Sequence, residues 1–393
     1  MTEIRDIPEA EIGRMFDLAG TVFHTRIEEG DHERDGWLLR RAERVGAYDG
    51  GTLVGQLASL PMRLAVPGAL LDCSAVTFVG VLPTHRRQGI LTAMMDRMDA
   101  DAIAAGRPVA ALWASEGVIY GRYGFGLATR AIVMEVDTSR PLELRTPLDD
   151  RPLRLVDAAS APELLDPIHR RALSARPGGL VRDTEWWTRG ILSETDREAP
   201  GYSAPRVVVH PAGYAVYRAH ERTIRVADLV ADTPPAEAAL WRFLASIDLS
   251  SRIVAQNRAV DDLLPHMAAD PDRVAVTKDT GVLWLRLIDV PAALRARSWA
   301  TGDTFVLQVG DARIAGNDGR WRLTTGATAS CDPTTEQPDL SLTAADLAAV
   351  YLGGQSPVTL ARIGAVTEHT PGAAARLAAA LAVPLAPYIN DEF

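Results

Sequence analysis

The chain has only two cysteines among its 393 residues, Cys73 and Cys331, and no C-x-x-C pair. Cysteines this few and this far apart in sequence supply neither a disulfide framework nor a zinc-binding pair. We therefore expect both thiols to be reduced and the protein to be cytoplasmic. The sequence also contains no H-E-x-x-H and no other metal-ligand spacing, so no metal is expected.

An apolar run of the length that a membrane helix needs is also missing, and so are the basic and apolar regions of a signal peptide. Lysine and arginine together number 41 against 51 aspartates and glutamates, which gives a formal net charge of −10. This balance argues against nucleic acid and anionic membranes as partners and favours cationic small molecules. The length and the ordinary globular composition allow two or three domains.

Two common phosphate-binding motifs are absent as well. The sequence has no G-x-x-x-x-G-K-[ST] of a P-loop kinase and no strand-linked G-x-G-x-x-G of a dinucleotide fold. Instead, a predicted strand at 76–82 leads through the basic loop 83–89 into a predicted helix at 90–104. The first N–H groups of a helix are unpaired, the helix dipole is positive there, and Gly89 allows close approach. This segment therefore predicts a pyrophosphate-binding loop.

The loop carries Arg86-x-x-Gly89-x-Leu91, which resembles the acyl-CoA loop [Q/R]-x-x-G-x-[G/A] of the GNAT acetyltransferase superfamily, apart from Leu91. By itself, R-x-x-G also fits an ordinary strand–helix turn with solvated arginines. The strings VLPTHRRQGIL and ALWASEGVIYGRYGFG together resemble one subgroup, the Eis (enhanced intracellular survival) family of aminoglycoside-type N-acetyltransferases. Further matching features are Pro177-Gly-Gly-Leu180 followed by Trp186-Trp187, Leu283-Trp-Leu-Arg286 followed by Val290-Pro-Ala-Ala-Leu294, and the ending Asp391-Glu392-Phe393.

The resemblance covers the whole chain and implies an α+β fold, with two GNAT-like mixed-sheet domains in tandem followed by a sterol-carrier-protein-like α/β domain. We expect a GNAT acetyltransferase domain with an acetyl-CoA site at 1–140, a second, degenerate GNAT-like domain at 141–290, and the sterol-carrier-like domain at 291–393, whose C-terminus completes the active site. The degenerate domain repeats the strand–loop–helix order, but its loop, 231–235, has neither glycine nor arginine to hold a pyrophosphate. An unrelated α/β unit is the alternative there.

The sequence pattern also predicts individual elements. In the first domain we expect a helix at 8–19 and strands near 45–49, 52–58, 61–65 and 73–82, followed after the loop and helix by strands at 109–114 and 128–137. The strand at 128–137 is expected to close the first sheet. In the second domain we expect strands near 206–217 and 222–231 and a helix at 235–247. In the third we expect strands near 304–309, 312–316 and 320–324 and helices at 343–351 and about 371–381.

Acyl transfer from a thioester to an amine needs a held cofactor, a polarised carbonyl, a base for the amine and an acid for the thiolate. The cofactor-binding residues that the resemblance implies are Val79, Gly80, Val81, Arg86, Arg87, Gln88, Gly89, Ile90, Leu91, Thr92, Ser115 and Glu116. Backbone N–H groups at the strand end would polarise the carbonyl, and the two arginines would contact phosphate. The family often has an arginine where Gln88 stands. Ser115 is expected to cap a short helix beginning at Glu116 rather than to act as a nucleophile.

Tyr120 is the general acid that the resemblance implies, because a phenol with a pKa of about 10 can protonate a thiolate. Packing between two glycines is its alternative role, and packing is the expected role of Tyr123. The implied base is the C-terminal carboxylate of Phe393. A carboxylate with a pKa of about 3.5 is a poor base, so it would hold the amine, relay through water, or have its pKa raised by burial. A frayed terminus is the alternative, but the apolar tail favours docking.

An acidic and aromatic pocket would suit a polycationic amine. By matching positions, the substrate-binding residues are Phe23, Ile27, Trp37, Phe78, Trp187 and Glu392. Thr25 stands where the family often has an aspartate, so either Glu28, Glu29 or Asp31 compensates or the substrate range differs.

The predicted function is therefore acetyl-CoA-dependent N-acetylation of primary amines on aminoglycoside-type polycations, by direct transfer, with a role in antibiotic resistance. The family resemblance also implies a homo-oligomer, specifically a hexamer. A protein-lysine or polyamine N-acetyltransferase is the alternative among enzymes. A hydrophobic-ligand carrier that uses the third domain is the alternative from another class, but a carrier has no need of Arg86-x-x-Gly89 or of a terminal carboxylate.

Overall fold

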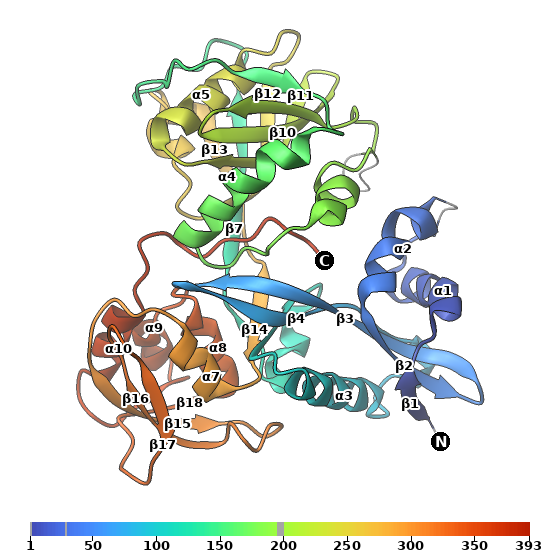
Figure 1. Cartoon of the computed structure of the whole chain (residues 1–393), viewed down its shortest axis with the longest axis vertical. Coiled ribbons are helices and arrows are strands. Elements are labelled where there is room, and N and C mark those ends of the chain that lie inside the picture. Colours follow the sequence, from blue (N-terminus) through green and yellow to red (C-terminus); the bar gives the residue numbers. More distant parts are fainter. Residues whose placement is uncertain (1, 28–29, 195–199) are drawn as a thin grey trace. The chain divides into compact units, whose positions relative to one another are not determined.

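The computed structural model describes residues 2–27, 30–194 and 200–393. The contacts between residues divide the chain into two compact units (Figure 1). Unit 1 consists of Met1–Thr129, Val282–Val383 and Glu392–Phe393, and unit 2 of Arg130–Gly281 and Pro384–Asp391. In the part of the chain that the structure describes, no helix is both long and apolar enough to cross a membrane.

The larger sheet of unit 1 has seven strands in the order β1-β2-β3-β4-β5-β14-β6. Their bounds are β1 Glu3–Asp6, β2 Glu43–Asp49, β3 Thr52–Val66, β4 Ala69–Val81, β5 Val109–Trp113, β14 Leu283–Leu287 and β6 Gly126–Leu127. β4 and β5 are parallel, and the helix α3 (Ile90–Ala104) connects them. The helix predicted at 90–104 is confirmed.

Helices cover both faces of this sheet. A Cβ on Gly55 of β3 would touch Ile90 and Met94 of α3, whereas a Cβ on Gly80 of β4 would approach the helix α1 (Ile12–Phe23). Gly80 pairs with Gln56, the residue after Gly55, so the two glycines face opposite sides of the sheet. The apolar residues that α1 buries recur at helical spacing, as the sequence predicts, but the helix begins after a 3₁₀ turn (Glu9–Glu11).

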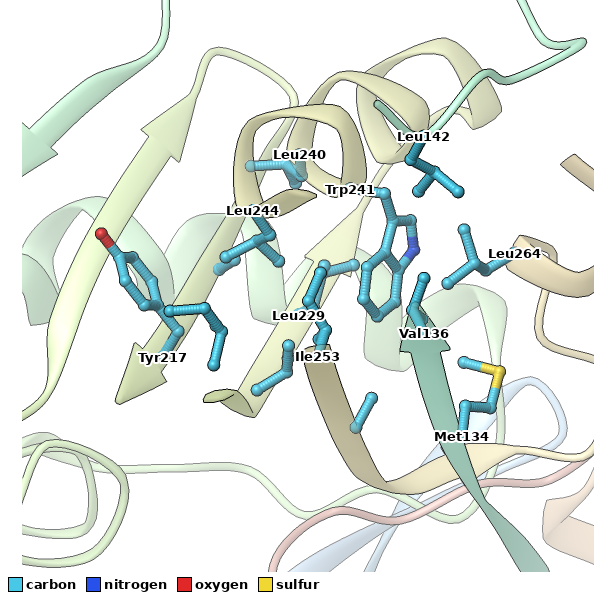
Figure 2. Packing of buried hydrophobic residues seen from close by; sticks show 14 of the residues in the cluster. Met134, Val136, Leu142, Tyr217, Leu229, Leu240, Trp241, Leu244, Ile253 and Leu264 are labelled. Atoms are coloured by element: carbon cyan, nitrogen blue, oxygen red, sulfur yellow. The ribbon is translucent and has the colours of Figure 1, made fainter. Parts of the chain in front are cut away.

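Unit 2 is built on a second seven-stranded sheet, in the order β13-β7-β12-β11-β10-β9-β8. Its strands are β7 Arg130–Asp137, β8 Arg154–Val156, β9 Arg206–His210, β10 Gly213–His220, β11 Thr223–Ala231, β12 Arg252–Ala259 and β13 Val274–Gly281. Its longer helices are α4 (Ala161–Ala175) and α5 (Pro234–Ala245), and shorter ones are η5 Trp186–Ile191, α6 Leu264–Met267 and η6 Pro271–Arg273. Figure 2 shows Trp241 of α5 inserted among Val136, Leu142 and Leu264 in the core under this sheet.

The two seven-stranded sheets share one topology but exchange a strand. β4, α3 and β5 of unit 1 correspond in order and direction to β11, α5 and β12 of unit 2. The position next to β5 in the first sheet is taken by β14, and the position next to β12 in the second sheet is taken by β7. In the chain, however, β7 comes directly after β6 of the first sheet, and β14 comes directly after β13 of the second. The prediction that 128–137 closes the first sheet is therefore wrong, because alternating apolar residues specify a half-buried strand but not its partner.

Unit 1 also contains a five-stranded sheet in the order β17-β16-β15-β18-β19. Its strands are β15 Thr304–Gly310, β16 Gly319–Thr324, β17 Ser330–Pro333, β18 Leu340–Thr343 and β19 Thr367–Glu368, and its helices are α7 Val290–Ala296, α8 Ala344–Tyr351, α9 Pro357–Arg362 and α10 Ala373–Leu381. The strand predicted at 312–316 is wrong. The Asp311 carboxylate accepts hydrogen bonds from the N–H groups of Arg313 and Ile314 and so forms a turn there.

Candidate active site

The loop between β4 and α3 has the backbone geometry of an anion-binding turn. Gly89 adopts a φ of 80°, and α3 begins after it without a side-chain cap and without an acidic residue in its first turn. Arg87 also has a positive φ, 63°. Residues 86–89 are exposed, and neither Arg86 nor Arg87 has a hydrogen bond or ion pair with any described residue. Two unpaired guanidinium groups beside uncapped helix amides suit a pyrophosphate.

The sheet opens next to this loop. The parallel pairing of β4 with β5 runs from Cys73, opposite Val109, to Val76, opposite Leu112, yet β4 continues to Val81. A bulge in β4 between Thr77 and Gly80 places Phe78 at a φ of 51°. The last residues of β4 therefore have no partner in β5, and this leaves backbone groups available to a ligand.

Tyr120 lies next to this opening. It is only 8% exposed and belongs to the same hydrophobic cluster against which Val79, Val81 and Leu91 pack. Its hydroxyl is not sealed in the interior, and it has no hydrogen-bond partner among the described residues. Burial, and secondarily the Glu116 carboxylate, raise the pKa of Tyr120 to about 12. The phenol is therefore fully protonated at neutral pH and available as a donor.

Tyr123 differs from Tyr120 because its hydroxyl is occupied. The hydroxyl lies 3.3 Å from Oγ1 of Thr92 in α3, and the guanidinium of Arg313 stacks 4.8 Å from the ring centre. These contacts make Tyr123 a packing residue that joins α3 to the turn after β5.

That turn contains the residues from Ser115 to Gly124. The helix in it is a single 3₁₀ turn, Gly117–Ile119, preceded by Glu116 and without a side-chain cap. The prediction that Ser115 is the N-cap is therefore wrong, since the helix begins one residue later than expected. Gly124 has a φ of 80°, and a Cβ there would collide with Arg286, which is fully buried and pairs with Asp99 and Asp311.

The C-terminal tail is docked, as the sequence predicts. Phe393 is 9% exposed, and together with Glu392 it groups with unit 1, which also contains Tyr120. The preceding residues, Pro384–Asp391, belong to unit 2, where Asp391 is buried against Arg182. Arg182 is not predictable as a partner of the tail, because Asp391 lies 209 positions further along the chain.

The expected substrate residues differ in their surroundings. Phe23, the last residue of α1, is 42% exposed, and Ile27 is half-buried. Phe78 packs edge-to-face on Phe16, with 5.7 Å between the ring centres. Trp37, in the helix α2 (Asp31–Arg41), is buried below the guanidinium of Arg41. Glu392 is exposed.

Trp187 has a different environment, in the core of unit 2. It is 1% exposed, and its ring contacts His169 and Tyr214 edge-on while the Arg182 guanidinium lies 4.5 Å from its centre. This packing favours a structural role for Trp187. Of the residues considered as compensation for Thr25, Asp31 is buried, and Glu28 and Glu29 lie outside the described residues.

Both cysteines are buried and free, and burial raises the pKa of each thiol to about 12. A thiol that is protonated at neutral pH is a poor nucleophile, so neither cysteine is suited to carry an acyl group. Across the described ranges, no three histidine, cysteine, aspartate or glutamate residues are grouped to hold a metal ion.

Comparison with known proteins agrees with this geometry. Residues 3–128 and 178–287 each match a family model of an acetyltransferase (GNAT) domain, and residues 290–390 match a sterol carrier protein domain. The chain is 37% identical over 411 residues to an uncharacterized N-acetyltransferase of Streptomyces avermitilis, with full coverage of both chains. It is also 36% identical to N-acetyltransferase Eis of Mycobacterium bovis over 351 aligned residues. This alignment covers 86% of this chain and 85% of that protein.

A solved structure extends the similarity to three dimensions. The crystal structure of Eis1 from Mycobacterium abscessus matches with a TM-score of 0.88 and 36% identity over the whole of both chains. The fold and the site therefore define an acyltransferase of the GNAT type, with two tandem GNAT domains and a sterol-carrier-like domain, as predicted. More particularly, the chain belongs to the Eis family of N-acetyltransferases.

Proposed function

We propose that the protein acetylates primary amines of aminoglycoside-type polycations with acetyl-CoA as the donor. GNAT acetyltransferases use acetyl-CoA, and the loop before α3 fits its pyrophosphate through Arg86, Arg87 and the uncapped helix amides. The observation that carries the proposal is the buried Tyr120, which packs in the same cluster as the end of β4 and whose hydroxyl has no hydrogen-bond partner within the described ranges. A net charge of −10 favours a cationic acceptor.

Acetyl-CoA, when bound, supplies an activated acetyl thioester. Arg86, Arg87, Gln88 and the amides from Gly89 to Thr92 would hold its phosphates, with Ser115 and Glu116 across the opening. Backbone N–H groups from Val79 to Val81 would donate to the carbonyl oxygen and stabilise the negative charge that develops on it. This requires no movement of the strand, because the bulge already separates β4 from β5.

Tyr120 would donate its phenolic proton toward the departing sulfur. Full transfer to a thiolate with a pKa of about 8.5 would be unfavourable by roughly 5 kcal/mol if that pKa were unchanged. Burial in the same site would also raise the pKa of the departing thiol, and this reduces the difference between the pKa values of Tyr120 and the thiol. We therefore assign Tyr120 a strong hydrogen bond to the developing thiolate, with the proton transferred as the negative charge accumulates on sulfur.

At the acceptor side, the Phe393 carboxylate would hold the incoming ammonium and receive its proton, directly or through one water molecule. Phe23, Ile27, Trp37 and Phe78 would provide apolar and aromatic surface to the amine, with Glu392 as a second negative charge. The hexamer that the family resemblance implies, and the cytoplasmic location, belong to the same proposal.

The carrier alternative would use a groove in the third domain. Its volume is about 320 Å³, and residues of α9 and α10 line it together with Val366 and Glu368. This volume is at the lower end for a small-molecule site, and the groove is open to solvent with Arg362 and Glu368 in its lining. No observation on the groove favours a carrier over the enzyme.

The double substitution of Arg86 and Arg87 by alanine tests the cofactor site. Each charge-assisted contact contributes roughly 1.5–3 kcal/mol, so the KM for acetyl-CoA should rise by about tenfold or more. The KM for the amine should change much less. Stability should be unaffected, because neither side chain has a hydrogen bond or ion pair in the part of the chain that the structure describes. Steady-state kinetics with each substrate varied in turn measures this. An unchanged KM for acetyl-CoA would refute the loop assignment.

A further inference from the structure

Unit 2 contains an opening that corresponds to the cofactor opening of unit 1. The parallel pairing of β11 with β12 ends at Val226, opposite Ala255, while β11 continues to Ala231. A bulge follows here as well, because Val216 and Tyr217 on β10 pair with Asp228 and Val226, which leaves Ala227 unpaired. The next helix, α5, is already capped, since Thr233 Oγ1 accepts a hydrogen bond from the Ala236 N–H. Nothing in this loop is suited to a pyrophosphate.

The chain's own C-terminal tail binds at this opening. Asn390 Nδ2 donates to the carbonyl of Ala227, the bulged residue, at 2.8 Å. Asp391 Oδ1 accepts from Arg182 Nε at 2.6 Å and from Trp186 Nε1 at 2.9 Å. The tail therefore covers a backbone carbonyl that β12 has left unpaired.

Arg182 bridges two carboxylates. Its Nη1 donates to Asp228 Oδ2 at 2.6 Å, and the same oxygen accepts from the hydroxyl of Tyr214 at 2.9 Å. Arg182, Asp228 and Asp391, which we call the tail latch, are 1%, 3% and 2% exposed. Buried charges persist only when they are paired and hydrogen-bonded, so each member depends on the others.

Contacts continue back along the tail. The Tyr388 N–H donates to the Pro177 carbonyl at 2.8 Å. Gly178, with a φ of 108°, lies against the backbone of Tyr388, because a Cβ on it would be only 2.8 Å from the Tyr388 carbonyl oxygen. The Ala386 N–H donates to the Asp261 carboxylate at 2.8 Å, and the Ala386 carbonyl accepts from Arg176 at 2.7 Å. These contacts hold the tail at residues 386, 388, 390 and 391, and all of them lie within unit 2.

We propose that the tail latch positions the C-terminal carboxylate for catalysis, so that unit 2 uses its counterpart of the cofactor opening to hold the catalytic tail. This inference depends on the proposed role of Phe393. The proposed base, Phe393, stands two residues after Asp391, so the chain between the buried carboxylate and the proposed one spans at most about 7 Å. Fixing Asp391 therefore confines the terminal carboxylate to a small volume. Arg182 and Asp391 are positioning residues, because they act through Phe393.

Asp391→Ala is the most direct test, since it changes neither the length of the chain nor its terminal residue. The latch predicts that hydrogen exchange of residues 384–391 accelerates by about tenfold or more, and that kcat falls by a similar factor. The KM for acetyl-CoA should stay within about twofold, because the cofactor loop belongs to unit 1. Arg182→Met should give the same pattern. If Arg182→Met does not fold, Asp391→Ala decides alone, because it leaves Arg182 paired with Asp228.

Arg273→Met is the matched control. It removes another buried arginine of unit 2, one that donates to the carbonyls of Asp137, Arg140 and Pro141 and does not contact the tail. This substitution should lower stability without changing the hydrogen exchange of residues 384–391 or the kcat of the folded enzyme. Unchanged exchange in Asp391→Ala would overturn the latch, and faster exchange with a wild-type kcat would overturn its positioning role. A wild-type rate in an enzyme extended beyond Phe393 would instead reject the proposed base itself.

Discussion

Tyr120→Phe is expected to lower kcat by about 10²–10⁴-fold, the usual contribution of general acid catalysis. The substitution keeps the ring in its cluster and removes only the hydroxyl. Because that hydroxyl has no hydrogen-bond partner among the described residues, the melting temperature and the KM for acetyl-CoA should change little. Steady-state kinetics and a thermal melt on the same preparation measure both quantities. Because burial raises the pKa of Tyr120 to about 12, wild-type activity should show no alkaline loss from this group below a pH of about 11.

Tyr123→Phe is the matched control for this prediction. It also removes one phenolic hydroxyl, but one that lies 3.3 Å from Thr92 and packs below Arg313. We expect a modest loss of stability, about 1 kcal/mol, and a kcat near that of the wild type. A severe loss in Tyr123→Phe together with a silent Tyr120→Phe would mean that the acid is the other tyrosine.

Extending the chain by a few residues beyond Phe393 should remove most turnover, by about 10²-fold or more. The extension replaces the terminal carboxylate with a neutral amide and carries the new carboxylate out of hydrogen-bond reach. Deleting Phe393 should have a similar effect, because it shortens the tail by one residue, about 3.6 Å at most. Acetyl-CoA binding, measured by calorimetry, should survive both changes, since the cofactor loop does not include the tail.

An N-terminal tag of the same length is the control for the extension, and we expect it to be tolerated. The extended enzyme should also keep slow exchange at 384–391 if Asp391 remains in the latch. If the extended enzyme ran at the wild-type rate, the carboxylate of Phe393 would have no catalytic role. The base would then have to be sought among Glu28, Glu29, Asp31 and His24.

The elements most accurately predicted from the sequence are those fixed by local signals. The sequence predicts α3 with its observed bounds because glycines flank it at 89 and 106. Two strands predicted at 52–58 and 61–65 are instead one strand, β3. Pro61 suggests an interruption, but it pairs opposite Ser74 with its side chain exposed, where the strand continues through it.

Features that depend on distant partners were not predictable in the same way. The sequence predicts β7 as a strand but does not predict β14, and which sheet each strand joins depends on edges formed by residues far away in sequence. The domain boundaries near 140 and 290 stay predictions. In the site, the resemblance named Tyr120 and the loop at 86–92, whereas the partner of Asp391 emerged only from the folded chain. A buried arginine is not visible in a sequence pattern, because isolated arginines are usually solvated.

The central claim is tested most directly by incubating the enzyme with acetyl-CoA and an aminoglycoside, a polyamine or a lysine-containing peptide, and following CoA release and product mass. We predict that the aminoglycoside gains acetyl groups, with a kcat/KM at least about tenfold above the values for the polyamine and the peptide. Acetylation of the peptide or polyamine with no acetylated aminoglycoside would contradict the proposed substrate class. Absence of CoA release with all three amines would contradict the proposed choice of acceptors as a whole.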